Sequence, residues 1–371
     1  MFSLTSVVYA QNVALPCPTP DAVSVFPRGD WFYSMALSPD GQQLGVVARS
    51  GIYLFDSSTL TLVKAIACFD DVFEGFAIAW SPNSRYLAHV QKHYDSSTEA
   101  YAYNLNIWDI ERQNRVTLVD ITNLPDWASC SIETLSWSPN GDYLAMSCPM
   151  YILSVSDIAR PELAFTSRQT ALSNQSSILP NTLSWSEEAE YLAAANGEEI
   201  FIWNTQTWGD EHNLHLEPAS SISPGTTTLS WTSAGYLAAG GYDQPLYLWE
   251  TQSWSVVELY TPYQANVVQF LPATSVLAFA GDPGDYSREW RNRVITILDV
   301  STNQVLQQLV VPDIPNVEGA RGTYVNGIEW LPDGRHLLSL QTEETVASII
   351  SLWDIETGEI LAEISLSALN S

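Results

Sequence analysis

One motif recurs seven times along the chain, and this repetition restricts the possible fold more than any other feature. Each copy has alternating apolar residues, a tight turn of the Ser-Pro-Asp-Gly type and a second apolar stretch that often begins with Tyr-Leu. The copies are residues 35–41, 78–84, 135–141, 183–189, 229–235, 268–274 and 328–334. An apolar alternation of period two indicates strands, and Pro and Gly suit the reversal between them.

A second signature stands at the end of the third strand of most repeats. It consists of an apolar residue, then an aromatic residue and then an acid or amide. It occurs as Phe55-Asp56, Trp108-Asp109, Trp203-Asn204, Trp249-Glu250 and Trp353-Asp354, with Leu298-Asp299 in repeat six and an eroded Ser156-Asp157 in repeat three. A polar turn and a fourth strand follow. Such a four-stranded unit buries only part of its apolar surface alone, so seven units are expected to cover one another.

The repeats resemble those of the WD-repeat β-propeller family, in a degenerate form of bacterial type. The resemblance covers nearly the whole chain from about Asp21. It implies an all-β fold, a single seven-bladed β-propeller of four-stranded antiparallel blades over residues 21–371. Successive anchors such as Leu37 and Trp80 lie 39 to 60 residues apart. A compact blade needs roughly 40–45 residues, so the excess belongs to particular loops.

The repeats also depart from the family pattern. The usual Gly-His pair before the first strand is missing from every repeat, and the Asp expected before the third strand survives clearly only as Asp243. The family's internal His–Asp–Trp network is therefore not expected, and apolar packing should hold the blades together. Nine tryptophans at repeat positions are predicted to be core: Trp80, Trp108, Trp137, Trp185, Trp203, Trp231, Trp249, Trp330 and Trp353.

Two segments compete for the outer edge of blade seven. Residues 360–366 follow its third strand directly, whereas residues 22–26 stand where a fourth strand would precede the first repeat. Closure of a local hairpin loses less chain entropy than closure over a long range. We therefore expect the C-terminal strand in this place, with residues 22–26 beside it as an extra strand or latch.

The charge of the chain excludes some classes of partner. The net charge is −28, because 42 acidic residues face only 14 basic ones, of which two are lysines. Such a surface repels phosphate backbones and anionic membranes, so nucleic acid is not expected as a partner. No apolar run approaches the length of a membrane-spanning helix. The simplest interpretation is that the acidic surface keeps the protein soluble.

The first twenty residues are either a signal-like segment or an N-terminal extension. Residues 2–9 are mostly apolar, and Val8-Tyr9-Ala10 fits the small-residue rule for signal cleavage, although no positive charge opens the segment. We expect export to the periplasm or the extracellular space. The alternative is an N-terminal strand in a cytoplasmic protein.

The sequence indicates no cofactor and no catalytic residue. It contains no Gly-Xaa-Ser-Xaa-Gly elbow, phosphate loop or dinucleotide fingerprint. His89 and His93, with Asp95 and Glu99 nearby, match no established metal-ligand spacing. Since propellers host many unrelated activities, we expect a non-catalytic binding scaffold. One alternative is a propeller enzyme, similar to a lactonase or hydrolase, with its site at the mouth of the central channel. The other is a purely structural ring within a larger assembly.

The long connections predict where a partner binds. They join fourth strands to the next first strand (120–133, 166–182 and 311–327) or second strands to third (90–104 and 281–293). In a propeller both classes emerge at the same end, and loops on a rigid scaffold often carry binding residues. This loop-rich face is the predicted surface for a protein or peptide.

Aromatic residues and arginines outside the repeat pattern gather in these loops. The predicted partner-binding set is Tyr94, Tyr101, Tyr103, Trp127, Tyr286, Arg288, Trp290, Arg291, Arg321 and Tyr324. Tyr, Trp and Arg dominate the energetics of protein interfaces, and arginine also binds carboxylates. The alternative is that Asp282, Asp285 and Glu289 neutralise the neighbouring arginines within the loop.

Cys130 and Cys148 are the one pair of cysteines for which the sequence offers a register argument for a disulfide. If Ser138 faces Gly141 across the turn of repeat three, the two cysteines lie within one residue of facing each other. A bulge or frayed end would then bring them within bonding distance. The alternative is two buried thiols. The other two cysteines could pair likewise, without a register argument.

Overall fold

The computed structural model describes residues 32–68, 77–95, 100–122, 132, 134–147, 150–166, 182–196, 199–215, 225–242, 245–257, 265–281, 294–312, 324–343 and 347–367. The regular elements in these ranges are all β-strands. In the same ranges, no helix is long and apolar enough to cross a membrane.

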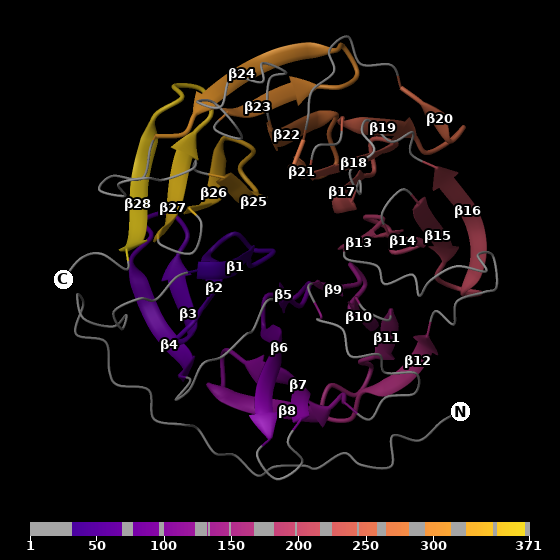
Figure 1. The fold of residues 1–371 in the computed structure, drawn as a ribbon, viewed down its shortest axis with the longest axis vertical. Coiled ribbons are helices and arrows are strands. Elements are labelled where there is room, and N and C mark those ends of the chain that lie inside the picture. Colours follow the sequence, from indigo (N-terminus) through magenta and orange to yellow (C-terminus); the bar gives the residue numbers. More distant parts are fainter. Residues whose placement is uncertain are drawn as a thin grey trace. The chain divides into compact units, whose positions relative to one another are not determined.

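The protein is a seven-bladed β-propeller of four-stranded antiparallel blades (Figure 1). The fold predicted from the seven copies of the motif is therefore confirmed. The chain divides into two compact units near Leu183. Blades one to three belong to the first unit and blades four to seven to the second.

In the first unit, each blade pairs its strands in chain order. Blade one contains β1 (Phe32–Leu37), β2 (Gln43–Ala48), β3 (Gly51–Asp56) and β4 (Leu62–Cys68). Blade two contains β5 (Ile78–Trp80), β6 (Tyr86–Asp95), β7 (Ala100–Asp109) and β8 (Asn114–Asp120). Blade three contains β9 (Leu135–Trp137), β10 (Tyr143–Met146), β11 (Tyr151–Ser154) and β12 (Glu162–Thr166).

The second unit follows the same order of pairing. Blade four contains β13 (Thr182–Trp185), β14 (Tyr191–Asn196), β15 (Glu199–Asn204) and β16 (Gly209–His215), and blade five β17 (Gly225–Thr232), β18 (Tyr236–Tyr242), β19 (Tyr247–Glu250) and β20 (Ser255–Val256). Blade six contains β21 (Val267–Phe270), β22 (Val276–Gly281), β23 (Val294–Asp299) and β24 (Gln304–Val310), and blade seven β25 (Tyr324–Trp330), β26 (His336–Glu343), β27 (Ala347–Asp354) and β28 (Ile360–Ser367).

The turn of blade three shows why the Ser-Pro-Asn-Gly motif recurs. The Gly141 N–H donates to the Ser138 carbonyl at 2.8 Å, and Gly141 adopts a φ of 80°, which glycine tolerates best. The Ser138 N–H then donates to the carbonyl of Tyr143 at 2.9 Å. Ser138 therefore faces Tyr143 and not Gly141.

This pairing corrects the predicted register of blade three by two residues, as the pair of Leu144 with Trp137 confirms. The prediction was wrong because the turn includes a left-handed Gly141 and one further residue. The argument that brought Cys130 and Cys148 opposite each other is thereby removed. Both cysteines lie outside the described residues.

The repeat tryptophans form the core, as predicted. All nine are buried, with between 1% and 9% of their surface exposed. In the first unit the Trp80 indole N–H donates to the carbonyl of Ala36 in the preceding blade at 2.9 Å. In the second unit Trp330 donates likewise to the carbonyl of Gln269 at 3.0 Å. Trp80 and Trp330 therefore join neighbouring blades through both apolar burial and hydrogen bonds.

Blade seven contains a buried hydrogen-bond network that the sequence did not predict. The Trp353 indole N–H donates to Ser339 Oγ at 2.8 Å, and the Gln341 amide donates to Ser339 and Ser351 at 2.9 and 3.1 Å. The Ser351 hydroxyl donates to Glu363 Oε1 at 3.0 Å. Serine and glutamine thus join the strands of this blade in addition to apolar packing.

The C-terminal strand completes blade seven. β28 pairs with β27 from Ser367 opposite Ala347 to Ile360 opposite Trp353. The expectation that the C-terminal strand forms the outer edge of blade seven is therefore confirmed. Residues 22–26, the expected extra strand or latch, lie outside the described part of the chain.

Candidate functional site

The structure places four of the ten predicted partner-binding residues in strands. Tyr94 and Tyr101 lie opposite each other near the end of the β6–β7 hairpin, Tyr103 lies in β7, and Tyr324 begins β25. The others fall outside the described residues; they are Trp127, Tyr286, Arg288, Trp290, Arg291 and Arg321.

The prediction for Tyr103 is wrong. Its side chain is only 8% exposed and belongs to the apolar core between blades two and three, with Leu105, Val119 and Ile121. Residues 90–104 were expected to be a long loop, but most of them extend β6 and β7. The reason is that the two strands continue to pair with each other well beyond the rest of their blade.

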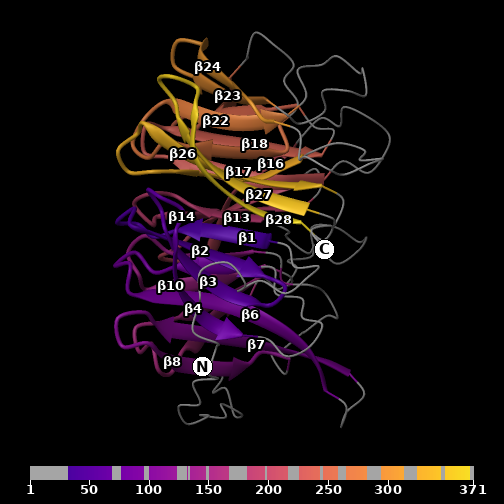
Figure 2. The ribbon, with the colours of Figure 1, turned by 90° about the vertical axis from the view of Figure 1, so that its left-hand side faces the viewer.

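The β6–β7 hairpin is the most distinctive feature of the first unit. β6 and β7 pair at ten positions, whereas β5 pairs with β6 at three and β8 pairs with β7 at six. Figure 2 shows the hairpin reaching past the neighbouring strands of its unit. Blade two therefore carries a two-stranded arm with Tyr94 and Tyr101 near its end.

The inner end of this arm is fixed to the blade. The Tyr103 N–H donates to Thr122 Oγ1 at 2.8 Å, and the Ile121 N–H donates to the Tyr103 carbonyl at 2.9 Å. The buried ring of Tyr103 packs in the same place. The hairpin thus extends from a rigid base. Because this base is already ordered, binding of a partner would remove less conformational entropy.

Blade two also buries a polar cluster on one face. His89 and Asn106 lie opposite each other in β6 and β7 and are 3% and 0% exposed. Arg115 Nη1 donates to Asn106 Oδ1 at 3.1 Å, and its guanidinium carbon lies 5.9 Å from the centre of the Trp108 ring. Burial, together with the charge of the nearby Arg115, lowers the pKa of His89 to about 3. His89 is therefore neutral at pH 7.

No group of three or more potential metal ligands occurs among the residues that the structure describes. His89, one member of the histidine pair considered in the sequence, lies within the buried face of blade two. The side chain of His93 is outside the described part.

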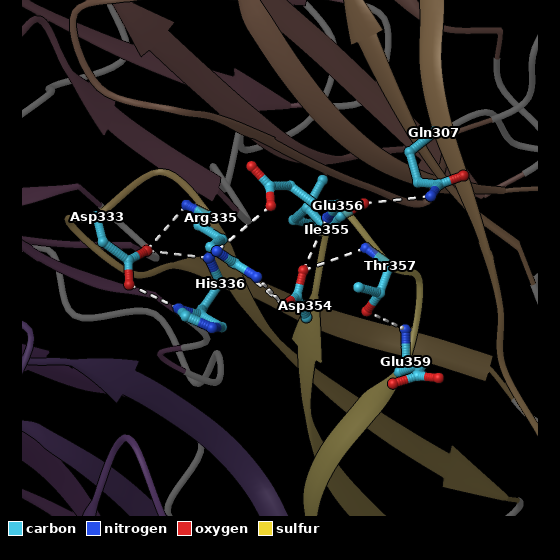
Figure 3. Close-up of polar contacts among 9 residues, drawn as sticks. All are labelled: Gln307, Asp333, Arg335, His336, Asp354, Ile355, Glu356, Thr357 and Glu359. Carbon is cyan, nitrogen blue, oxygen red and sulfur yellow. Dashed lines mark hydrogen bonds and ion pairs between the residues drawn. The ribbon is translucent and has the colours of Figure 1, made fainter.

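At the short-turn end of blade seven, ion pairs join two turns (Figure 3). Arg335 Nη2 lies 2.7 Å from Asp354 Oδ2, and Nη1 lies 3.3 Å from Glu356 Oε2. Asp354 Oδ1 also accepts the Glu356 and Thr357 N–H groups at 2.9 and 3.2 Å. The hydrogen bond from Arg335 holds the pKa of Asp354 below its ordinary value. His336 Nδ1 lies 2.6 Å from Asp333 Oδ2.

Blade two repeats this arrangement. Arg85 Nη2 lies 2.7 Å from Asp109 Oδ2, and Arg85 Nε lies 3.5 Å from Glu111 Oε2. The Arg112 N–H donates to Asp109 Oδ1 at 2.9 Å. In both blades the arginine follows the first turn and the acid ends the third strand. The pairs neutralise these groups and fasten the turns, so they form a structural tie.

The ion pair of blade two predicts a moderate loss of stability in Asp109→Asn. The carboxylate is buried, but Arg85 remains about one third exposed and can be hydrated when its partner is lost. We therefore expect the free energy of unfolding to fall by about 1 kcal/mol. Urea denaturation measures this, with the exposed Asp142→Asn as a control for the lost charge. Equal midpoints for the two variants would contradict the interpretation.

Glu329 has the most strongly raised carboxyl pKa among the described residues for which a shift is resolved. It lies in β25 opposite Leu338 and is half-buried. Removal of water from the carboxyl raises its pKa to about 8. This glutamate is therefore largely protonated at pH 7, and a perturbed pKa of this kind also occurs at functional sites.

Cys68, at the end of β4, is disulfide-bonded. Cys17, Cys130 and Cys148 lie outside the described residues. A disulfide is typical of proteins in oxidising compartments.

The comparisons with known proteins identify the fold. No protein-family model matches the chain, and no curated protein matches it. The β-propeller domain of Cps50 (Swd1) from Myceliophteria thermophila matches with a TM-score of 0.64 and 13% identity, over 88% of this chain and 97% of that one. A chain of the mitotic checkpoint complex matches with a TM-score of 0.61 and 16% identity, over 96% of each chain. Together with the seven repeats, these matches indicate a WD-repeat-like propeller.

Proposed function

We propose that the protein is a non-catalytic scaffold, a degenerate WD-repeat propeller of bacterial type that binds a protein or peptide. One of the similar solved structures belongs to the mitotic checkpoint complex, and a role in an assembly is carried over from it as part of this proposal. Net charge disfavours nucleic acid and anionic membranes as partners. The disulfide at Cys68 supports a place of action in the periplasm or outside the cell.

The observation that carries the proposal is the β6–β7 arm. The hairpin continues beyond the flanking strands of its blade, so its outer part pairs only with itself, and this extra length calls for an explanation. Tyr94 and Tyr101 occupy opposing positions near its end, and tyrosine is a frequent anchor in interfaces. Tyr324, at the start of β25, remains part of the proposed surface, as do the predicted residues outside the described part of the chain: Trp127, Tyr286, Arg288, Trp290, Arg291 and Arg321.

The enzyme alternative has one observation in its favour. Glu329 supplies a carboxyl group that is protonated at neutral pH and that could donate a proton. One carboxyl group alone does not make a catalytic arrangement. Binding therefore remains the function that the geometry supports best.

Shortening the arm tests the proposal. Removal of residues 94–101, with His93 joined to Ala102 through Asn-Gly, keeps Tyr103 in the core and closes the hairpin with a favoured two-residue turn. We expect the variant to lose its partner in affinity capture from the native source, while its melting temperature stays close to that of the wild type.

A substitution far from the arm provides the control. Leu361→Ser removes an exposed apolar side chain from β28, so its effect on surface hydrophobicity is similar but its location differs. The control should retain the partner. Retention of the partner by the shortened variant, at the wild-type amount, would show that the arm is not the recognition element.

A further inference from the structure

Cys68 is the last residue of β4, the outermost strand of blade one, and it is already bonded to another cysteine. It pairs with Gly51 of β3, is half-buried and is disulfide-bonded. The chain contains four cysteines, so the second half of this bond is Cys17, Cys130 or Cys148. The described strands decide among the three, because the Cα atoms of a disulfide lie no more than about 7 Å apart.

Cys148 belongs to blade three. The Ser147 N–H donates to the Thr134 carbonyl at 3.0 Å, and the Thr134 N–H donates to Ser147 Oγ at 3.0 Å, which continues the β9–β10 ladder by one pair. Cys148 follows at once, so its Cα lies about 3.8 Å from that of Ser147. Within the first unit, blade two lies between blades one and three (Figure 1). Because stacked sheets lie about 10 Å apart, Cys148 is out of reach of Cys68.

Cys130 lies beyond blade two in the same way. It stands two residues before Ile132, which is 2% exposed and belongs to the same core cluster as Ile107 of β7 and the strands of blade three. Trp108, the next residue of β7, packs instead with blade one. Since successive side chains of a strand point to opposite faces, the sheet of blade two stands between Ile132 and blade one. Two residues of chain are too short to pass around it to β4.

Cys17 is the remaining cysteine, and its place in the chain allows the bond. It precedes Phe32, the first residue of β1, by fifteen residues, which span up to about 50 Å when extended. β1 and β4 are the innermost and outermost strands of one four-stranded sheet, about 15 Å apart. The chain before β1 is therefore long enough to bring Cys17 to the end of β4.

The residues around Cys17 favour a covalent attachment over a strand pairing. They read Pro-Cys-Pro-Thr-Pro over residues 16–20. Proline has no backbone N–H, so these residues cannot add to the edge of β4 as a further regular strand. A disulfide holds such a segment without a ladder of hydrogen bonds.

We propose that Cys17 is the partner of Cys68, and that their bond is a covalent clasp on blade one. The loop that it closes, residues 17–68, contains all four strands of that blade. A cross-link over a long loop lowers the conformational entropy of the unfolded chain and so stabilises the folded blade.

Formation of the clasp is a thiol–disulfide exchange. The two cysteine thiols are oxidised to one disulfide, and their two electrons and two protons pass to a disulfide of a thiol oxidoreductase, which becomes two thiols. Such a reaction requires an oxidising compartment, as the proposed place of action supplies. The pairing does not depend on the β6–β7 arm or on its partner, so the tests of the two proposals can fail separately.

Tryptic mapping without reductant tests the pairing. Protein from its native source is alkylated with iodoacetamide in denaturant and then digested. Cleavage after lysine and arginine gives peptide 65–85 with Cys68, a peptide ending at Arg28 with Cys17, and peptide 116–168 with both other cysteines. We expect mass spectrometry to find peptide 65–85 linked to the peptide that ends at Arg28, and reduction to release both. Linkage of peptide 65–85 to peptide 116–168, or its recovery with an alkylated cysteine, would overturn the pairing.

Serine variants test the clasp. Cys17→Ser and Cys68→Ser break the same bond, so each should lower the melting temperature by roughly 5–10 °C, and the double variant should lower it no further. Val63→Ser, at an exposed position of the same strand, is the control and should change it by less than about 2 °C. Losses that add in the double variant, or a Cys17→Ser variant that melts like the control, would contradict the clasp.

Discussion

Gly240→Ala is expected to lower the free energy of unfolding by about 2–3 kcal/mol, since overpacking against a backbone group cannot be relieved by a side-chain rotation. A Cβ atom at Gly240 in β18 would lie 2.2 Å from the carbonyl oxygen of Ala265, which precedes the first strand of the next blade. The glycine therefore permits close approach of two backbones in the second unit.

Urea denaturation of Gly240→Ala, followed by tryptophan fluorescence, measures this effect. Gly209→Ala is the matched control, because its new Cβ would meet only the Thr207 hydroxyl, at 3.3 Å. We expect the control to change the free energy of unfolding by no more than about 0.5 kcal/mol. Similar midpoints for both variants would mean that the close packing of Ala265 against Gly240 does not contribute to the stability of the protein.

His89 is expected to make the protein sensitive to acid. Burial lowers its pKa from 6.5 to about 3 in the folded state. Between these two values the unfolded chain binds a proton at His89 and the folded chain does not, so stability falls as the pH falls below 6.5. At pH 5 the expected loss from this residue is about 2 kcal/mol relative to pH 7.5.

The variant His89→Gln isolates this contribution. The free energy of unfolding of the variant can differ from that of the wild type at any one pH. As the pH falls from 7.5 to 5, however, the wild type should lose more stability than the variant. Urea midpoints measured at several pH values give this difference. A difference that stays constant over the range would show that His89 does not titrate on unfolding.

The fold could be predicted from the sequence because the same local pattern is repeated seven times. The period-two strands, the turns and the buried tryptophans at Trp80 and Trp330 all depend on short-range information and on burial that each blade shares. The placement of the C-terminal strand followed from local closure. These features do not depend on the exact register between strands.

The details of the candidate site depended on register and on long-range pairing, and there the sequence was less informative. Residues 90–104 are rich in polar side chains and were interpreted as a loop, yet β6 and β7 satisfy their backbone groups by pairing with each other. Tyr103 is buried as a result. The left-handed turn at Gly141 shifted the register that the cysteine argument required.

The ion-pair ties were also missed, although the sequence contained a signal. Arg85 and Arg335 stand at the same place in their repeats, directly after the first turn of the blade, and Asp109 and Asp354 both end the third strand. An alignment of the repeats by the positions of their charged residues would have paired each arginine with its aspartate. Their distance of 2.7 Å follows only from the register of each blade.

The binding function is tested most directly by photo-crosslinking from the arm. A photoreactive phenylalanine derivative at Tyr101 places the reactive group near the end of the β6–β7 hairpin, and the same group at Ser365 of β28 serves as the control. Irradiation in the native source should give one adduct of defined mass from position 101 and not from position 365. An adduct from both positions alike, or from position 365 alone, would contradict recognition through the arm.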